Sequence, residues 1–252
     1  MKNALLIAAT AAALSLAFPA VAADRTTEKV QAALALAYRT EADTRRDANR
    51  APLQALQFMG LRDDMKVFEF GPGAGWYTKI LAPVLKDEGE LIIGYKKEWI
   101  DELADLLAEP ELSAVRRVNL DMDWDSELYA FSFNSMDFDA EGLDMFLNIR
   151  EYHNLHGGDR MAFNRAVFEA LKPGGRYVVV DHSRRHMQPD GPENVRREDP
   201  VKVLVEVQSA GFDLLDYSDM FYRLDDSLEY EVGRRTVAGN TDRFFFVFTK
   251  PE

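Results

Sequence analysis

The sequence predicts an open, doubly wound α/β sheet of mostly parallel strands, with the last strand antiparallel. Three observations support this fold class. Seven short apolar segments alternate with amphipathic segments at helical spacing, which is the pattern of βαβ units. A glycine-rich turn, Gly71-Pro72-Gly73-Ala74-Gly75, follows the first apolar segment. The connection over residues 217–243 has only a weak helical pattern, so we expect the final strand to return as a hairpin partner.

The elements can be placed in order along the chain. The predicted strands cover residues 65–70, 90–95, 114–118, 142–149, 176–180, 212–217 and 243–249. Apolar residues spaced three and four apart predict helices over 80–85, where Pro83 should cause a kink, and over 99–107. A third helix is expected from an N-cap at Asp159 to Leu171, and a fourth from Asp199-Pro200 to Gly211. Residues 121–140 are acidic and aromatic without a clear period, which predicts a loop with at most a short helix.

The N-terminus resembles a secretory signal peptide over residues 1–23. Lys2 supplies the positive charge, an uncharged apolar run follows, and Ala20-Val21-Ala22 is an A-x-A cleavage signal. The run is shorter than the roughly 20 apolar residues of a membrane-spanning helix. We therefore expect export, in a bacterium to the periplasm, with no stable membrane anchor after cleavage. An uncleaved N-terminal anchor is the alternative. Residues 24–60 are expected to form a helical segment that either covers the ligand cleft or supports a dimer, and residues 61–252 the α/β domain.

The charge balance of the chain limits its partners. It has 43 acidic residues, 30 Lys or Arg, a formal net charge of −13 and no cysteine. Binding to a nucleic-acid backbone requires a basic surface, so we expect no nucleic-acid partner. The acidic balance favours a small or cationic substrate, and the absence of cysteine excludes a disulfide scaffold.

Glu69 stands directly before the glycine-rich turn. Glycines allow the backbone to turn tightly and to approach a ligand, with a helix N-terminus behind the turn. The spacing differs from the G-x-G-x-x-G fingerprint of dinucleotide-binding proteins. A carboxylate at position 69 can accept hydrogen bonds from an amino-bearing or cationic ligand. A purely structural tight turn is the alternative interpretation.

The histidines give a second candidate for chemistry. All four follow the fourth and fifth predicted strands: His153, His156, His182 and His186. That edge of a doubly wound sheet is where ligands bind. Histidine titrates near neutral pH, so His153, supported by Tyr152, is the first candidate for a general base, and His182, oriented by Asp181, is the second. A divalent metal site or histidines that are merely exposed in polar loops remain alternatives.

Taken in order, these motifs resemble the class I S-adenosylmethionine-dependent methyltransferases. The glycine-rich turn and the helix stop Pro173-Gly174-Gly175 stand roughly 100 residues apart, each on the element expected for that family. More narrowly, the chain resembles a group of exported methyltransferase-like proteins over nearly its whole mature length. That narrower resemblance rests on an ordered set of motifs: Arg46-Asp47 with Arg50, Pro72-Gly73-Ala74-Gly75-Trp76-Tyr77, Ile80-Leu81-Ala82-Pro83, Tyr152-His153, Val180-Asp181-His182 and Ala210-Gly211-Phe212.

The resemblance implies a Rossmann-like methyltransferase fold with a seven-stranded sheet and S-adenosyl-L-methionine as the cofactor. It places Glu69, Gly71, Pro72, Gly73 and Gly75 around the methionine part of that cofactor. It further suggests Tyr77 as a lining residue of the cofactor cleft, and Asp121 or Asp123 as the partner of the adenine amino group. In this family an acidic residue at the end of the second strand binds the ribose, but here residues 93–98 have no carboxylate at that place and Glu98 comes late.

The sequence thus predicts methyl transfer from S-adenosyl-L-methionine to a small-molecule acceptor, with His153, Tyr152, His182 and Asp181 as the catalytic candidates and no bound metal. The alternative is an exported ligand-binding protein, or a histidine-site metal protein, that reuses the fold without this chemistry.

Overall fold

The computed structural model describes residues 17–252, and the side chains from residue 24 onward. Residues 1–16 of the expected signal peptide therefore lie outside the described residues. Residues 17–23 begin the first helix, α1 (Ala17–Leu34). Within the described residues, no helix is long and apolar enough to cross a membrane.

The central sheet has seven strands in the order β3-β2-β1-β6-β7-β9-β8. Neighbouring strands from β3 to β7 are parallel, whereas β9 runs antiparallel to both β7 and β8. The doubly wound, mostly parallel sheet with an antiparallel last strand is therefore confirmed. The strands are β1 (Lys66–Phe70), β2 (Glu90–Tyr95), β3 (Arg116–Asn119), β6 (Leu143–Ile149), β7 (Leu171–His182), β8 (Asp213–Ser218) and β9 (Arg243–Thr249).

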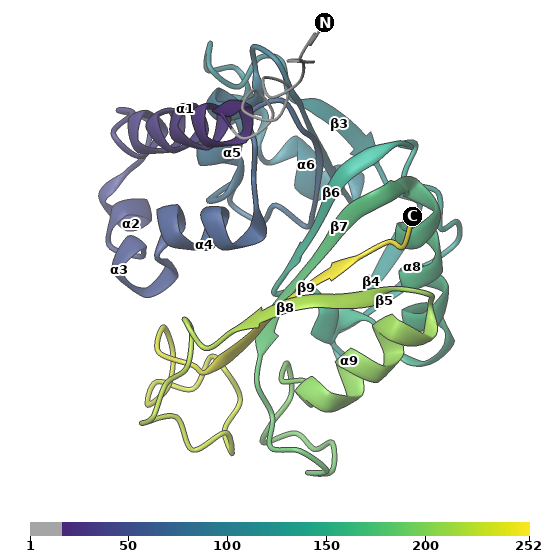
Figure 1. Cartoon of the computed structure of the whole chain (residues 1–252). Coiled ribbons are helices and arrows are strands. Elements are labelled where there is room, and N and C mark those ends of the chain that lie inside the picture. Colours follow the sequence, from purple (N-terminus) through teal and green to yellow (C-terminus); the bar gives the residue numbers. More distant parts are fainter. Residues whose placement is uncertain (1–16) are drawn as a thin grey trace, which may run out of the picture.

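Helices cover both faces of this sheet (Figure 1). On one side lie α1 and α5 (Thr78–Leu85), with α4 (Pro52–Met59) and α6 (Lys97–Asp101) beside them. On the other side lie α8 (Gly157–Ala170) and α9 (Pro200–Ser209). The remaining helices are α2 (Glu41–Thr44), α3 (Asp47–Arg50), α7 (Ala104–Leu107) and the 3₁₀ turn η1 (Tyr152–Asn154). Coverage on both faces explains why the central strands are apolar without alternation.

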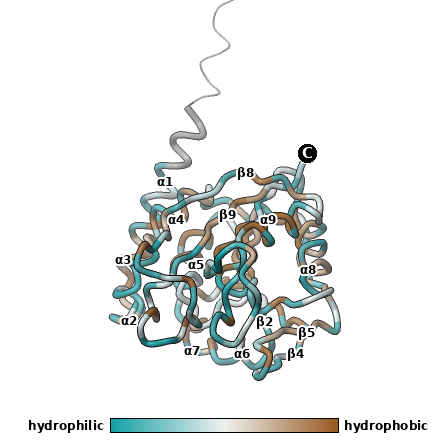
Figure 2. Tube along the Cα trace, turned by 90° about the horizontal axis from the view of Figure 1, so that it is seen from below, coloured by the Kyte–Doolittle hydropathy of each residue, from teal (hydrophilic) through white to brown (hydrophobic). Residues whose placement is uncertain are grey.

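The hydrophobic core lies between these layers. Figure 2 shows apolar stretches in the interior of the trace and hydrophilic ones at its outside. Phe68 of β1 stacks on Phe146 of β6 with ring centroids 4.8 Å apart, and both rings are fully buried. Phe70 and Phe163 extend this contact to α8 with centroids 4.8 Å apart. The aromatic packing fixes β1 against β6, which are the two strands between which the strand order reverses.

Three local expectations were wrong. Residues predicted as an irregular loop form a hairpin of β4 (Met122–Asp125) and β5 (Ala130–Phe133). The helix expected over 99–107 is divided into α6 and α7. The N-cap of α8 is His156 rather than Asp159, which lies in the first turn of that helix. At α9, by contrast, Asp199 caps the helix as expected, because its side chain accepts a hydrogen bond from the Val201 backbone.

Candidate active site

A cavity of about 400 Å³ opens at the carboxyl ends of β1, β2 and β6. It lies where the strand order reverses between β1 and β6, the usual ligand crevice of an open α/β sheet, and its volume is that of a small-molecule site. Its walls come from the glycine-rich turn after β1, Tyr95 at the end of β2, His182 at the end of β7, and four residues directly after β6: Arg150, Glu151, His153 and Asn154. Arg46 and Arg50 close one side, so residues 24–60 do cover part of the cleft.

The glycine-rich turn leaves room for a ligand at Gly73. Gly71 and Gly73 have φ values of 64° and 54°, which side chains other than glycine adopt at a cost. A Cβ atom on Gly73 would meet nothing within 4 Å, so this backbone faces open space. Gly71 and Pro72 also line the cavity, as expected. Gly75 does not, and a Cβ there would lie 2.5 Å from the Leu106 side chain, so its role in this structure is packing.

Glu69 is a buried carboxyl group on the wall of the cavity. Its side chain is 5% exposed and accepts a hydrogen bond of 2.7 Å from the Thr78 hydroxyl. Burial raises the pKa of Glu69 to about 7, although Thr78 and the Arg50 charge pull in the opposite direction. Near neutral pH the group can therefore be present as an acid or as a carboxylate. Tyr77, which the sequence suggested for the cleft, also lines the cavity.

A second carboxyl group, Glu151, lines the cavity and was not anticipated from the sequence. Its Oε2 accepts hydrogen bonds from the Tyr95 hydroxyl at 2.9 Å and from the Asn154 amide at 3.0 Å. Burial raises its pKa to about 7. Gly71 makes room for it, since a Cβ at that position would lie 2.5 Å from Glu151 Cγ. Tyr95 thus ends β2, where the resemblance had led us to look for an acid, while Glu98 is exposed and outside the cavity.

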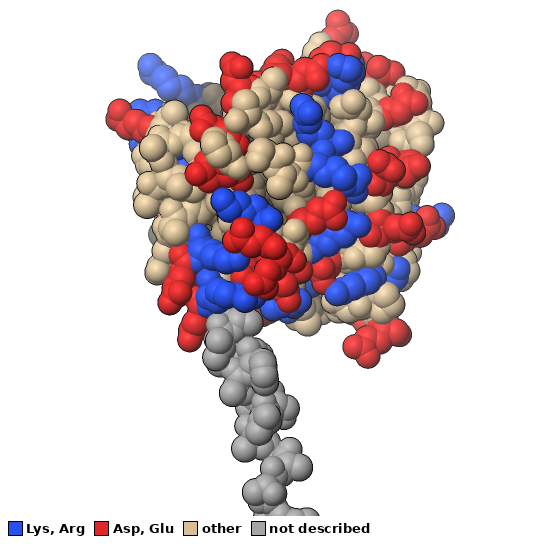
Figure 3. Space-filling model, turned by 90° about the horizontal axis from the view of Figure 1, so that it is seen from above, with Lys and Arg blue, Asp and Glu red and all other residues tan. Residues whose placement is uncertain are grey.

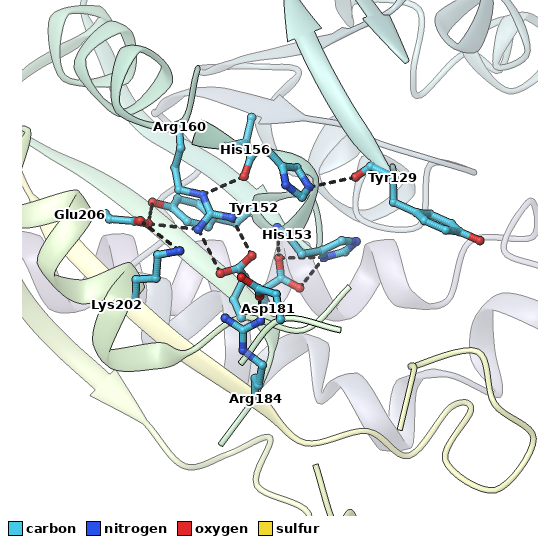
Figure 4. Close-up of polar contacts among 12 residues, drawn as sticks. Tyr129, Tyr152, His153, His156, Arg160, Asp181, Arg184, Lys202 and Glu206 are labelled. Carbon is cyan, nitrogen blue, oxygen red and sulfur yellow. Dashed lines mark hydrogen bonds and ion pairs between the residues drawn. The ribbon is translucent and has the colours of Figure 1, made fainter. Parts of the chain in front are cut away.

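His153 and Asp181 form a buried pair at the cavity wall (Figure 4). The Nδ1 atom of His153 lies 2.8 Å from Asp181 Oδ1, and the His153 backbone donates a hydrogen bond of 2.9 Å to Oδ2. The His182 backbone donates to the same carboxylate at 2.7 Å, and Asp181 is completely buried. A carboxylate at Nδ1 holds the proton there, so Nε2 is the basic atom. Nε2 makes no hydrogen bond within the described residues, and is the atom left for a ligand.

His182 lines the same cavity, but both of its ring nitrogens are occupied. Arg150 Nε donates to His182 Nε2 at 3.0 Å, and Thr241 Oγ1 lies 2.8 Å from Nδ1. Burial, together with the Arg150 charge, lowers the pKa of His182 well below its ordinary value. The ring is therefore neutral, and its Nε2 lone pair is used by Arg150. His182 positions Arg150 and is poorly placed as a base, contrary to the expectation.

Two predicted site residues lie away from the cavity. The Tyr152 hydroxyl accepts a hydrogen bond of 2.9 Å from Asn164 and lies 3.2 Å from Glu206, on the α8 and α9 side of the sheet (Figure 4). It therefore cannot support His153 directly. Asp121 is exposed and accepts a hydrogen bond of 3.0 Å from Asn134 at the foot of the β4–β5 hairpin. Neither residue lines the cavity.

The other histidines do not join His153. His186 is paired with Asp199 at 2.9 Å, and His156 Nε2 lies 3.3 Å from the Tyr129 carbonyl oxygen. Among the residues that the structure describes, no group of three or more His, Asp or Glu side chains is arranged to hold a metal ion.

An aromatic wall completes the cavity and had no clear sequence signal. Trp99 follows β2, and Trp124 and Tyr129 belong to the unexpected hairpin. The Tyr95 and Trp99 ring centroids are 4.5 Å apart, and those of Trp99 and Trp124 are 6.0 Å apart. The sequence pattern of residues 121–140 is that of a loop, so it does not predict that Trp124 and Tyr129 lie beside Trp99.

The sequence matches no protein-family model, and no curated protein is significantly similar to it. Solved structures are similar in fold. A SAM-dependent methyltransferase from Aquifex aeolicus has a TM-score of 0.58 at 15% identity, covering 88% of this chain and 97% of its own. The [4+2]-cyclase SpnF has 0.58 at 17%, covering 81% of each chain. The glycopeptide N-methyltransferase MtfA, complexed with sinefungin, has 0.52 at 16%, covering 82% and 94%. The chain therefore has the Rossmann-like methyltransferase fold.

Proposed function

We propose that this protein transfers a methyl group from S-adenosyl-L-methionine to a small-molecule acceptor. One observation carries the proposal: a single cavity is lined by the glycine-rich turn, by the buried Glu69 and by His153, whose Nδ1 is paired with Asp181. A backbone turn that can bind the methyl donor and a side chain that can accept a proton therefore line the same cavity. The fold alone would not support this conclusion, because one fold hosts many activities.

The residues of the cavity fit the proposed cofactor. Open space above Gly73 admits the methionine part, and Glu69 can accept hydrogen bonds from its amino group. Glu151 can accept hydrogen bonds from the ribose hydroxyls. This residue, directly after β6, would take the place of the acid that is missing at the end of β2. The rings of Trp99 and Trp124 provide apolar faces for a purine.

Bound S-adenosyl-L-methionine would supply a methyl group made electrophilic by its sulfonium. His153 Nε2 would accept the proton that an O–H, N–H or S–H group of the acceptor releases when it is methylated. Asp181 keeps the Nδ1 proton in place and stabilises the imidazolium that forms. Orientation of the two reactants within the cavity supplies the remaining rate enhancement.

We also propose that the chain is exported, on the basis of the leader over residues 1–23. The fractionation of an expressed full-length chain tests this: recovery of shortened protein outside the cytoplasm supports export, and full-length protein in the cytoplasm contradicts it.

Calorimetric titration with S-adenosylmethionine and S-adenosylhomocysteine tests the donor site. The expected result is micromolar binding by the protein beginning at residue 24, weakened at least tenfold in Glu69→Gln and Gly73→Val. The exposed Asp121→Asn provides the matched control and should bind like the parent. An absence of binding at millimolar ligand would refute the methyltransferase proposal and leave a protein that keeps the fold for another purpose.

A further inference from the structure

A second cavity of about 310 Å³ adjoins the first and is lined by arginines. The two share Arg46, Arg50, Arg150, His182 and Val232. Arg45 and Arg243 complete a set of five arginines, with no aspartate or glutamate among the lining residues. This is unexpected in a chain of net charge −13. On the face drawn in Figure 3, for comparison, basic and acidic side chains are intermingled.

Buried arginines elsewhere in the described part of the chain have carboxylate partners. Arg197 pairs with Asp226 at 2.9 Å, and Arg160 pairs with Glu198. Burial of an unpaired charge is costly, so such partners are the rule. The arginines of the second cavity are the exception that needs an explanation.

Arg50 shows the exception most clearly. It is 8% exposed, and within the described residues its guanidinium has no hydrogen bond and no ion pair. The guanidinium lies against aromatic rings instead, with its carbon 4.5 Å from the centre of Trp76 and 5.9 Å from that of Tyr77. Burial and the nearby Arg46 lower the pKa of Arg50 to about 9, so it is still a cation at neutral pH.

Arg243 and Arg150 face the same space. Arg243 is 7% exposed, bonds only to Asn49 through Nη2, and has a buried Nε without a partner in the described chain. Burial lowers its pKa to about 10. Arg150 has a φ of 67°, a conformation that is uncommon outside glycine, and within the described residues its side chain donates a hydrogen bond only to His182. Backbone strain of this kind accumulates where a side chain must be aimed.

We propose that Arg46, Arg50, Arg150 and Arg243 bind an oxyanion group, a carboxylate, phosphate or sulfate, of the methyl acceptor. The assignment of the anion to a methyl acceptor rests on the proposed function. The anion site itself rests only on the contacts of the four arginines. Guanidinium groups bind such oxyanions through paired hydrogen bonds, and one anion would neutralise the mutual repulsion of the cluster. The anion would lie close to the base, since His182 contacts Arg150 and its ring centroid is 6.1 Å from that of His153.

The acidic composition favoured a small or cationic substrate, whereas the proposed site binds an anionic group of the substrate. The carboxylate of the donor is the other possible source of the same chemistry. Competition with S-adenosylhomocysteine distinguishes the two sources of the anion.

Inorganic phosphate and sulfate are the probes for the site, titrated into the protein in chloride buffer and followed by calorimetry and by thermal unfolding. We expect millimolar or tighter binding that raises the unfolding temperature. Arg150→Gln and Arg243→Gln should weaken binding at least fivefold, whereas Arg165→Gln, an exposed arginine of α8, should not change it. Arg50→Met should raise the unfolding temperature without anion and abolish the increase that phosphate causes. Binding that is absent, or equally affected by Arg165→Gln, would overturn the proposal.

The same titration at saturating S-adenosylhomocysteine identifies the source of the anion. Phosphate binding that persists supports an acceptor anion, and competition between the two assigns the arginines to the donor carboxylate and overturns the acceptor assignment. Phosphate binding by a protein that binds no S-adenosylhomocysteine supports the anion site and separately refutes the proposed methyl transfer.

Discussion

Replacement of Glu69 by glutamine should change how stability depends on pH. The side chain keeps its shape, and its oxygen can still accept the Thr78 hydrogen bond, but it no longer ionises. In the parent protein the pKa of Glu69 is raised from 4.5 to about 7 by burial. Ionisation therefore costs the folded state about 3 kcal/mol more than it costs the unfolded chain.

The direction in which stability changes with pH follows from proton binding. Between the two pKa values the folded protein holds this proton and the unfolded chain has released it, so the free energy of unfolding falls as pH rises. The contribution of the protonated Glu69 is complete below about pH 4.5 and is lost as pH rises through about 7. Between about pH 5 and pH 8 the parent should lose about 2.5 kcal/mol through this residue, and Glu69→Gln should not.

Urea unfolding of both proteins at the two pH values measures this directly. The stability of the variant relative to the parent should rise by about 2.5 kcal/mol from pH 5 to pH 8, whatever the fixed cost of the substitution. Glu169→Gln, at an exposed position of α8, controls for the change in net charge. A relative change below about 0.5 kcal/mol would show that Glu69 ionises as in water, and the argument from burial would be wrong.

Three further predictions concern other parts of the molecule. Gly94→Ala should destabilise the protein by about 1–3 kcal/mol in urea unfolding, because its Cβ would lie 2.2 Å from the fully buried ring of Phe68; an unchanged midpoint would contradict the packing. Asp226→Ala should cost about 3–5 kcal/mol by leaving Arg197 buried and unpaired, and a loss under 1 kcal/mol would refute this. His153→Gln should lower kcat by about 10²–10⁴ with donor affinity retained; unchanged turnover would exclude it as the base.

The sheet was predictable from sequence because its strands are buried on both faces and its turns carry strong local signals. The hairpin over β4 and β5 was not predictable in the same way. Met122 is buried and Trp124 half-buried, but acidic residues alternate with them, and the resulting stretch looks like a polar loop. The start of β7 was missed for a related reason, since Pro173-Gly174-Gly175 reads as a turn although the strand runs through it from Leu171.

Residues of the candidate site were predictable only where they lie at, or shortly after, the carboxyl end of a strand. Glu69, Gly73 and His153 meet this condition. Tyr152 follows the same strand as His153, but the side chains of adjacent residues point in different directions. The Tyr152 hydroxyl points toward α9. Arg46 and Arg50 belong to a motif of the sequence, but nothing in the sequence joins them to Arg150, directly after β6, or to Arg243 at the start of β9. Only the folded chain brings these residues together in the arginine cavity.

The position of β9 between β7 and β8 has a consequence for synthesis. β8 pairs with the sheet only through β9, although β9 is made after it. Until residue 249 has left the ribosome, β7 therefore presents a free apolar edge, and β8 has no strand to pair with. Such an edge is a template for pairing with other chains. Nascent chains should accordingly be vulnerable to aggregation and proteolysis until the last of the seven strands has emerged from the ribosome.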